Sequence, residues 1–443
     1  LLGGPITINV GAQSWELPQS QLAEMIRVER GNAADGSDML NVSIDGSRIP
    51  EFLTPIADET EVKGSYPRLD WNGGDLQIIS EGSSGERINE ALLAEQVLAA
   101  FDLPAHQRTI EAGFETIPPP VNAANLADLG ITDLLSVGRS DFAGSAAYRV
   151  TNIKAGMRLL HGILLAPGDE FSFNDSVGTI DASNGFVEGY AIIQNRTQLE
   201  WGGGICQDST TMFRAAFWAG LPITERWGHS FYISWYDKYA FGEYGNGPGM
   251  DATIFTPGGP DLKFLNDTGH WLLIQTVVDS AKTIAEVRIY GTDTGRVVKL
   301  EGPTISKKTP APTEPVYVAE PERPRGSPRQ SDTARGGMTI DFTRLVYQNG
   351  TLTERRTFQT VFKPWPNIFE INPADLGPDG KPLPKTTPTP DPALVPTTDP
   401  ALVPPTTQPE PQPEPQPQPE QPPAIPTAVP QPPSVPQPPP ADG

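Results

Sequence analysis

The residue best suited to covalent chemistry is Cys206, the single cysteine of the 443-residue chain. It follows three consecutive glycines in Trp201-Gly-Gly-Gly-Ile-Cys206-Gln207 and precedes a segment with helical spacing of apolar residues. A lone thiol cannot form an internal disulfide, glycines let the backbone approach a substrate, and a helix N-terminus stabilises a thiolate. We therefore interpret Cys206 as a nucleophile, with a small buried hydrophobe as the alternative.

Thiol-based acyl transfer also needs an imidazole that takes the thiol proton and a polar group that orients the imidazole. Of the four histidines, His229 in Trp227-Gly-His-Ser230 is the best placed, and Asp251 opens the next apolar segment. We expect a helix bearing Cys206 and two strands bearing His229 and Asp251 to meet at one end of a sheet. The alternative for His229 is a structural role. The other histidines lie in a connector, at a helix end and in a turn: His106, His161 and His270.

Residues beside the proposed triad are candidates for binding the substrate. Backbone N–H groups near Gly203 and Gly204, with Gln207, are expected to hold an oxyanion. Trp201 and Trp227 flank the triad and are expected to line a groove, although most tryptophans of this region belong to the core. The sequence shows no metal site or nucleotide loop, so no metal or other cofactor is expected.

Asp208 argues against a reactive thiol. A carboxylate two residues from the sulfur opposes ionisation, although in the first helical turn it interacts well with the helix dipole. Which effect dominates depends on where its side chain points.

The elements that would position these residues indicate an α+β chain of several parts. Residues 1–120 are expected to form a small α+β domain, closed by Pro118-Pro-Pro120. Its expected strands lie at 6–10 and 15–17 and its expected helices near 22–26 and 88–101.

Residues 122–298 are expected to form the catalytic domain. Helices are predicted over 150–160 and from 206 to Gly220, a natural C-terminal cap. The strands expected after them span 231–236, 251–255, 271–278 and 286–290. Helices followed by an antiparallel run of strands favour an α+β fold.

The C-terminal third is rich in proline. Residues 299–335 are interpreted as a linker, 336–372 as a small β appendage and 373–443 as a disordered Pro-rich tail. The tail repeats Asp391-Pro-Ala-Leu-Val-Pro as Asp399-Pro-Ala-Leu-Val-Pro. It has too few apolar residues to bury a core.

Composition limits the partners. With 54 acidic and 32 basic residues, the net charge is -22, which disfavours nucleic acid. No stretch approaches the length of a membrane span. Since the chain starts with Leu1-Leu2-Gly3-Gly4 rather than Met, we consider a signal or membrane anchor ahead of it.

Several segments within residues 122–298 resemble the VanW family. They are Arg149-Val-Thr-Asn152, Pro167-Gly-Asp-Glu-Phe-Ser-Phe-Asn174, Gly202-Gly-Gly-Ile-Cys-Gln-Asp-Ser-Thr-Thr211, His229-Ser230, Asp251-Ala-Thr253 and Asp261-Leu-Lys-Phe-Leu-Asn266. The preceding unit is similar to the peptidoglycan-binding domain often found ahead of VanW domains. The order of Cys, His and Asp is similar to the papain/transglutaminase-like arrangement. The chain departs from the family at Asp208, where an apolar residue is usual, and at His161, where asparagine is frequent.

VanW domains of some Gram-positive bacteria are recognised as L,D-transpeptidases with a cysteine nucleophile. The resemblance therefore implies an extracytoplasmic enzyme at the cell surface or wall, with peptidoglycan as partner and Cys206 forming a thioester. Two alternatives remain: a cysteine amidopeptidase that hydrolyses stem peptides, and a non-catalytic peptidoglycan-binding adaptor linked to glycopeptide resistance. The sequence does not indicate an oligomeric state.

Overall fold

The computed structural model describes residues 3–32, 34–35, 37–193 and 196–384. All elements below belong to one compact unit within Leu1–Leu383. A 3-10 turn, Pro373–Asp375, begins the stretch expected to be a disordered tail. From residue 385 onward that prediction lies outside the described residues.

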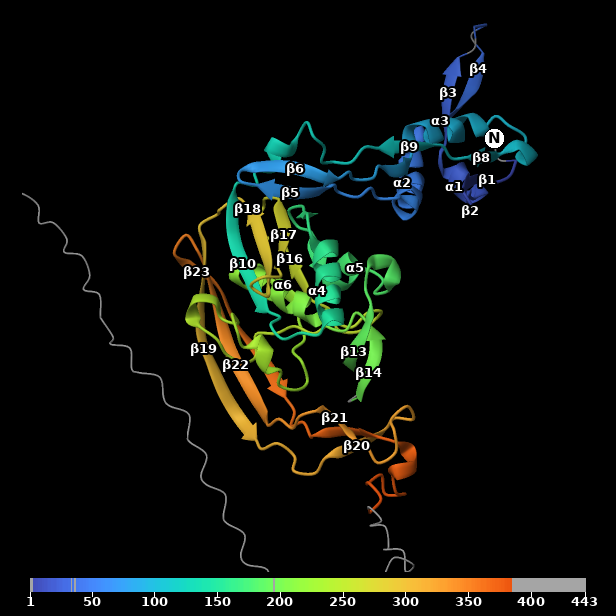
Figure 1. Cartoon of the computed structure of the whole chain (residues 1–443). Helices are drawn as coiled ribbons and strands as arrows, with labels where there is room; N and C mark the ends of the chain where they lie inside the picture. Colours follow the sequence, from blue (N-terminus) through green and yellow to red (C-terminus); the bar gives the residue numbers. More distant parts are fainter. Residues whose placement is uncertain (1–2, 33, 36, 194–195, 385–443) are drawn as a thin grey trace, which may run out of the picture. The chain divides into compact units, whose positions relative to one another are not determined.

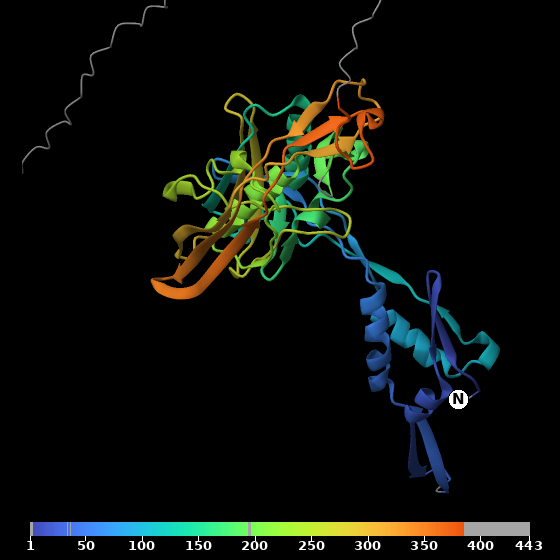
Figure 2. The same cartoon turned by 90° about the horizontal axis from the view of Figure 1, so that it is seen from below.

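The N-terminal part mixes short strands with three helices, and α2 and α3 pack along each other (Figure 2). Its elements are β1 (Ile6–Val10), β2 (Gln13–Leu17), α1 (Gln19–Glu24), β3 (Ile26–Asn32), β4 (Asp38–Ile44), α2 (Ile49–Thr60), β5 (Arg68–Asn72), β6 (Asp75–Ser80), β7 (Gly85–Ile88), α3 (Glu90–Ala100), β8 (Thr109–Glu111) and β9 (Phe114–Ile117). The two expected strands are present, and α3 accounts for the second expected helix. The first expected helix ends early, since Ile26 already begins β3.

The hairpin β5–β6 does not stay within the expected N-terminal domain. Leu69 is fully buried in a cluster with Leu273 and Tyr290 of the following region. Trp71 stacks on Tyr290 at 5.3 Å between ring centroids, and Gln275 donates to the Asp70 carboxylate. A core shared in this way crosses the domain boundary expected near residue 120.

The central part is built on a four-stranded antiparallel sheet in the order β10-β18-β17-β11, with α4 and α6 packed on it (Figure 1). Its elements are β10 (Asp133–Asp141), α4 (Ala147–Leu160), β11 (Ile163–Leu165), β12 (Glu170–Ser172), α5 (Phe173–Val177), β13 (Glu188–Ile193), β14 (Arg196–Trp201), α6 (Cys206–Trp218), β15 (Ile223–Glu225), β16 (Lys263–Leu265), β17 (Leu272–Asp279) and β18 (Ile284–Gly291). Gly220 follows α6 with φ +72°, as the sequence predicts.

Two strands expected in this part are absent. Residues 231–236 are irregular and end in a 3-10 turn, Ser234–Tyr236. Residues 251–255 form only an isolated bridge, between Trp227 and Thr253. Side chains replace strand partners here: the fully buried Arg214 donates to Met250 O at 3.0 Å and to Tyr236 O.

The stretch at 299–335 is not simply a linker, because it contains strands. The C-terminal elements are β19 (Arg296–Thr309), β20 (Val316–Ala319), β21 (Arg329–Asp332), β22 (Gly337–Gln348), β23 (Thr351–Phe362) and β24 (Ile368–Ile371). They form the sheets β19-β22-β23 and β20-β24-β21. Pro303 is tolerated in β19 because the register shifts between Glu301 and Thr304, which removes the need for its N–H.

The helix α6 is buried along its length because sheets cover it on two sides. One is the central sheet, through β10 and β18. The other is β19-β22-β23, whose Phe342 and Phe358 lie 5.9 and 5.5 Å from the Phe217 ring. Burial of three aromatic rings at one helix joins the β appendage to the main core. The strands that were expected to form an appendage therefore pack against the helix that begins at Cys206.

Candidate active site

Two glycines of the run before α6 occupy positions where a side chain would not fit. Gly202 and Gly204 have φ values of +73° and +115°. A Cβ at Gly202 would lie 2.3 Å from the Ile180 side chain, and one at Gly204 would lie 2.7 Å from Arg149 Cγ. Backbone conformation and close packing therefore both require glycine at these two positions.

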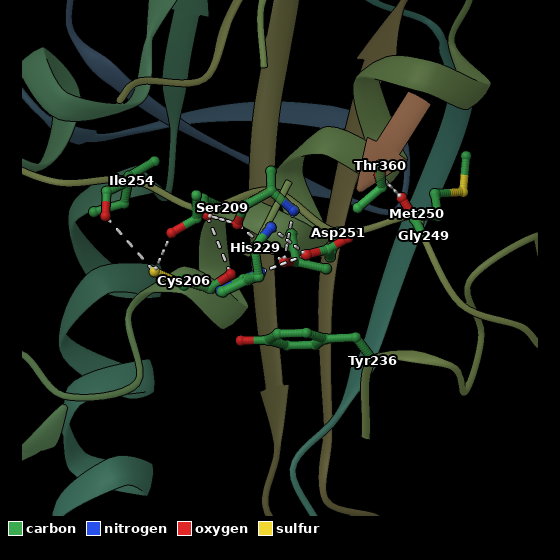
Figure 3. Close-up of polar contacts among 12 residues, drawn as sticks. Cys206, Ser209, His229, Tyr236, Gly249, Met250, Asp251, Ile254 and Thr360 are labelled. Atoms are coloured by element: carbon green, nitrogen blue, oxygen red, sulfur yellow. Dashed lines mark hydrogen bonds and ion pairs between the residues drawn. The ribbon is translucent and has the colours of Figure 1, made fainter. Parts of the chain in front are cut away.

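Asp251 and His229 form a buried pair. One carboxylate oxygen, Oδ2, accepts from the backbone N–H of His229 at 2.9 Å and also contacts the ring Nδ1 (Figure 3). The second oxygen, Oδ1, lies 3.3 Å from Nη2 of the buried Arg226. Because Asp251 occupies Nδ1, Nε2 is the ring nitrogen available to a nucleophile.

Cys206 lies next to this pair. Its Sγ is 3.5 Å from Thr253 Oγ1 and 3.7 Å from the Ile254 carbonyl oxygen (Figure 3). The residue is partly exposed. The His229 imidazole is near enough to lower the pKa of this thiol. The structure thus brings together the three residues that the sequence proposed as a triad. Cys206 starts α6 as expected, whereas His229 and Asp251 lie on irregular segments instead of strands.

The electrostatics of the three residues favour a charge-separated state. Burial alone raises the pKa of the Cys206 thiol, but the hydrogen bond and charge of His229 outweigh it and lower the pKa to about 7. Burial lowers the pKa of His229, and hydrogen bonds with Asp251 and Cys206 more than compensate, raising it to about 9. Despite burial, contacts with His229 and Arg226 lower the pKa of Asp251 to about 2. Near neutral pH the site therefore favours a thiolate, an imidazolium and a carboxylate.

Asp208 does not oppose this state in the way that the sequence suggested. It is fully buried, and neither carboxylate oxygen has a hydrogen-bond partner among the described residues. Burial raises its pKa well above the ordinary value, against the smaller effect of Arg149. Burial and the charge of Cys206 both raise the pKa of Asp208 and so favour its neutral form, which carries no charge that could repel the thiolate.

The expected oxyanion donors are only partly suitable. Gln207 is fully buried, accepts from Arg149 Nη2 at 2.8 Å and donates to Ser140 Oγ at 3.2 Å. Its side chain is therefore engaged inside the core rather than turned toward a substrate, and its role in binding substrate stays a prediction. Within the described part of the chain, the backbone N–H of Cys206 has no acceptor, whereas those of Ile205 and Gln207 do. The backbone N–H groups of Gly203 and Gly204 likewise have no acceptor among the described residues, so these two expected donors and Cys206 N–H remain free.

The two candidate groove residues remain accessible. Trp201 is 42% exposed and Trp227 is 55% exposed. The indole of Trp227 donates to Glu225 Oε1 at 2.9 Å, so its ring is held at the surface. A groove of about 680 Å³ runs past Glu225, Ile180 and Thr256, and Ile180 also packs against Gly202.

Side chains distant in sequence hold the Asp251 segment in place. Arg226 donates to Gly249 O at 2.7 Å and to Thr360 Oγ1 at 2.9 Å. Thr360 itself donates to Gly249 O at 2.8 Å (Figure 3). Ser209 of α6 donates to Ala252 O at 2.7 Å. The sequence analysis missed Arg226 and Thr360, because no spacing relates them to the triad.

The remaining histidines do not approach the sulfur. His161 Nδ1 accepts from Thr276 N at 3.1 Å, a structural contact. His106 is exposed in the 3-10 turn Ala105–Gln107, and His270 is exposed in a loop. Among the described residues, no group of three or more His, Cys, Asp or Glu side chains is arranged to hold a metal ion. None of the helices described combines the length and hydropathy needed to cross a bilayer.

Known proteins resemble the central part of the chain. Residues 148–289 match the profile of the family described as VanW like protein. The uncharacterized protein YoaR of Bacillus subtilis is 29% identical over 197 residues, which are 44% of this chain and 61% of YoaR. The vancomycin B-type resistance protein VanW of Enterococcus faecalis is 32% identical over 139 residues, which are 31% of this chain and 48% of that protein.

The chain thus spans about half to three fifths of the curated relatives that it matches. A crystal structure of HP0197-G5 covers 17% of this chain and 97% of its own at 13% identity, with a TM-score of 0.10 that supports no argument. The matched segment includes the glycine run, Cys206, His229 and Asp251. In this segment the chain is similar to the VanW family.

Proposed function

We propose that this protein is a cell-wall cysteine acyltransferase, an L,D-transpeptidase that cross-links peptidoglycan stem peptides through a thioester. The observation that carries the proposal is a partly exposed Cys206 thiol beside an imidazole that Asp251 orients. The name of the vancomycin-resistance relative supports a substrate in the cell wall. Residues 122–298 are proposed as the catalytic domain, with an arrangement like that of papain and transglutaminases.

The first half of the reaction transfers an acyl group to sulfur. The Cys206 thiolate attacks the stem-peptide carbonyl between diaminopimelate and D-alanine, forming a C–S bond. The developing oxyanion accepts a hydrogen bond from Cys206 N–H. His229 donates its Nε2 proton to the leaving nitrogen as the C–N bond breaks, releasing D-alanine and leaving a thioester.

The second half returns the acyl group to nitrogen. The amine of a second stem peptide attacks the thioester carbonyl, and His229 accepts the proton that this amine loses. The C–S bond breaks, restoring the thiolate and the imidazolium. Asp251 stays ionised throughout and fixes the imidazole through Nδ1.

Hydrolysis is the competing outcome, favoured by the partial exposure of Cys206. Water in place of the acceptor amine would make the protein an amidopeptidase. The same thioester forms in both reactions, so only the product distinguishes them.

The test is incubation of the purified chain with a disaccharide tetrapeptide stem, with products identified by mass spectrometry. Transfer gives a cross-linked dimer that has lost one D-alanine, and hydrolysis gives a tripeptide. Both products should disappear in Cys206→Ala, and the reaction should slow by about 10²–10⁴-fold in His229→Asn. Muropeptides of cells carrying wild type or Cys206→Ala should differ in diaminopimelate–diaminopimelate cross-links.

The exposed His270 supplies the matched control, His270→Asn, which should retain activity. Identical muropeptides in wild type and Cys206→Ala, with a thiol that alkylates only after denaturation, would reject the enzyme. Those results would favour a non-catalytic wall-binding adaptor. Because the proposed substrate is peptidoglycan, the proposal also places the protein outside the cytoplasm. It further assigns peptidoglycan binding to the N-terminal part.

A further inference from the structure

A cation without a carboxylate partner lies against the residues on either side of Cys206. Arg149, near the start of α4, lies against Gly204, since a Cβ there would be 2.7 Å from its Cγ and 3.4 Å from its Nη1. Its Nη2 donates to Gln207 Oε1 at 2.8 Å, and it also hydrogen-bonds Tyr236. The Tyr236 ring lies 5.2 Å from the His229 ring. Arg149 is thus fixed within the same group of side chains as the triad.

The contacts of Arg149 are with neutral groups. Its Cζ lies 5.5 Å from the centre of the Trp235 ring, which is 47% exposed. None of the ion pairs among the described residues includes Arg149. Burial raises the pKa of Asp208, the acid on which its charge acts, well above the usual range. Beyond the hydrogen bonds to Gln207 and Tyr236, no other acceptor for the guanidinium is found in the described part of the chain, so part of its five N–H donors and its charge remain available.

Such a group is suited to bind a carboxylate. A planar guanidinium matches a carboxylate with two parallel N–H donors, and the pair is stronger where solvent is partly excluded. In the proposed donor, the leaving D-alanine carries a free carboxylate one residue beyond the carbonyl that Cys206 attacks. We propose that Arg149 is a specificity residue that binds the free C-terminal carboxylate of the acyl-donor peptide. This inference rests on the proposed function and deepens it, since it restricts the donor to peptides that end next to the scissile bond.

Alkylation of Cys206 tests the inference without any peptide substrate. Iodoacetate and iodoacetamide both form an S–C bond and release iodide, and they differ in the carboxylate. In the native protein the rate ratio of iodoacetate to iodoacetamide should exceed that of free cysteine. Arg149→Gln should lower this ratio by about tenfold or more, the effect of losing one charged hydrogen bond, with the iodoacetamide rate nearly unchanged.

Two further variants separate charge from structure. Arg149→Lys keeps the charge and should retain part of the preference for iodoacetate. Arg158→Gln is the matched control from the same helix, because Arg158 donates to Asn184 O away from the sulfur. It should keep the native ratio.

The peptide reaction gives the second measurement. A tetrapeptide donor with a C-terminal carboxylate should react about 10–100 times faster than its C-terminal amide in wild type and at nearly the same rate in Arg149→Gln. An alkylation ratio equal in wild type and Arg149→Gln, or equal losses with both donors, would overturn the role of Arg149 while leaving the triad intact. A Cys206 that neither reagent labels in the folded protein would instead reject the proposed function, and this inference with it.

Discussion

Asp251 is the residue on which the charge of the site depends. It remains ionised although it is buried, since its carboxylate accepts from His229 and faces Arg226. That negative charge holds the proton on His229, and the imidazolium in turn favours the thiolate of Cys206. The low pKa of this thiol is explained by the neighbouring imidazolium, without invoking the helix N-terminus.

The pH dependence of acyl transfer should report this coupling. kcat/KM should rise as the Cys206 thiol ionises near pH 7 and fall as His229 loses its proton near pH 9. Asp251→Asn removes the charge that raises the pKa of His229, so the falling limb should move to lower pH. The rising limb should move to higher pH, because a neutral imidazole no longer favours the thiolate, and the maximum should drop by about 10²–10⁴-fold. Profiles with unmoved limbs would contradict this account, and Asp267→Asn, at a surface ion pair with Arg296, is the control.

Asp208 should make stability depend on pH. Its pKa is raised by burial in the folded state, so between about pH 4 and that higher value the folded chain binds a proton that the unfolded chain has lost. Raising the pH therefore lowers the free energy of unfolding in this range. Asp208→Asn cannot ionise and should gain stability over wild type on going from about pH 3 to about pH 7, by about 1.4 kcal/mol per unit of pKa elevation. Urea unfolding across this range measures the difference, and parallel curves would show that the folded carboxyl is ionised.

At the scale of elements, the β23 strand takes part in the site. Its Thr360 is 2% exposed and reaches Gly249 and Arg226, while Lys363 N donates to Ser230 O at 2.7 Å. The segments that carry His229 and Asp251 have little regular structure of their own. A neighbouring sheet therefore supplies the rigidity that a strand would otherwise provide.

Thr360→Val keeps the shape of this side chain but removes both hydrogen bonds. Leaving Gly249 O without one of its donors should cost about 1–3 kcal/mol of unfolding free energy. It should also lower kcat/KM by about tenfold through a less well-positioned Asp251. The exposed Thr357 on the same strand bonds only Thr343 at 2.8 Å, so Thr357→Val should change neither quantity. Equal kcat/KM for the two variants would show that β23 does not position the site.

The parts of the site that depend on neighbouring residues in the sequence could be predicted. The glycine run, the helix after Cys206 and the order of Cys206, His229 and Asp251 are all visible in the chain itself. Gln207 was expected beside the substrate, but its side chain points from the first turn of α6 into the core. Arg226 and Thr360 had no signal, since 134 residues separate them.

At the scale of the whole molecule, the expected division into separate domains does not describe the packing. Buried clusters join β5–β6 to the central sheet and β22–β23 to α6. The proline content of 299–335 suggested a linker, but the register shift in β19 accommodates Pro303. Amphipathic periodicity predicts single elements well and says little about which distant element covers an apolar face.

The bond from Thr360 to Gly249 spans 111 residues of sequence, and this has a consequence for the timing of synthesis. A ribosome completes the segments that carry Cys206, His229 and Asp251 well before it reaches β23. Until that strand emerges, Gly249 and Arg226 lack their outer partner and one side of α6 lacks its aromatic cover. The nascent chain therefore passes through an interval in which Cys206, His229 and Asp251 are already synthesised while the segments that carry them still lack the support of β23.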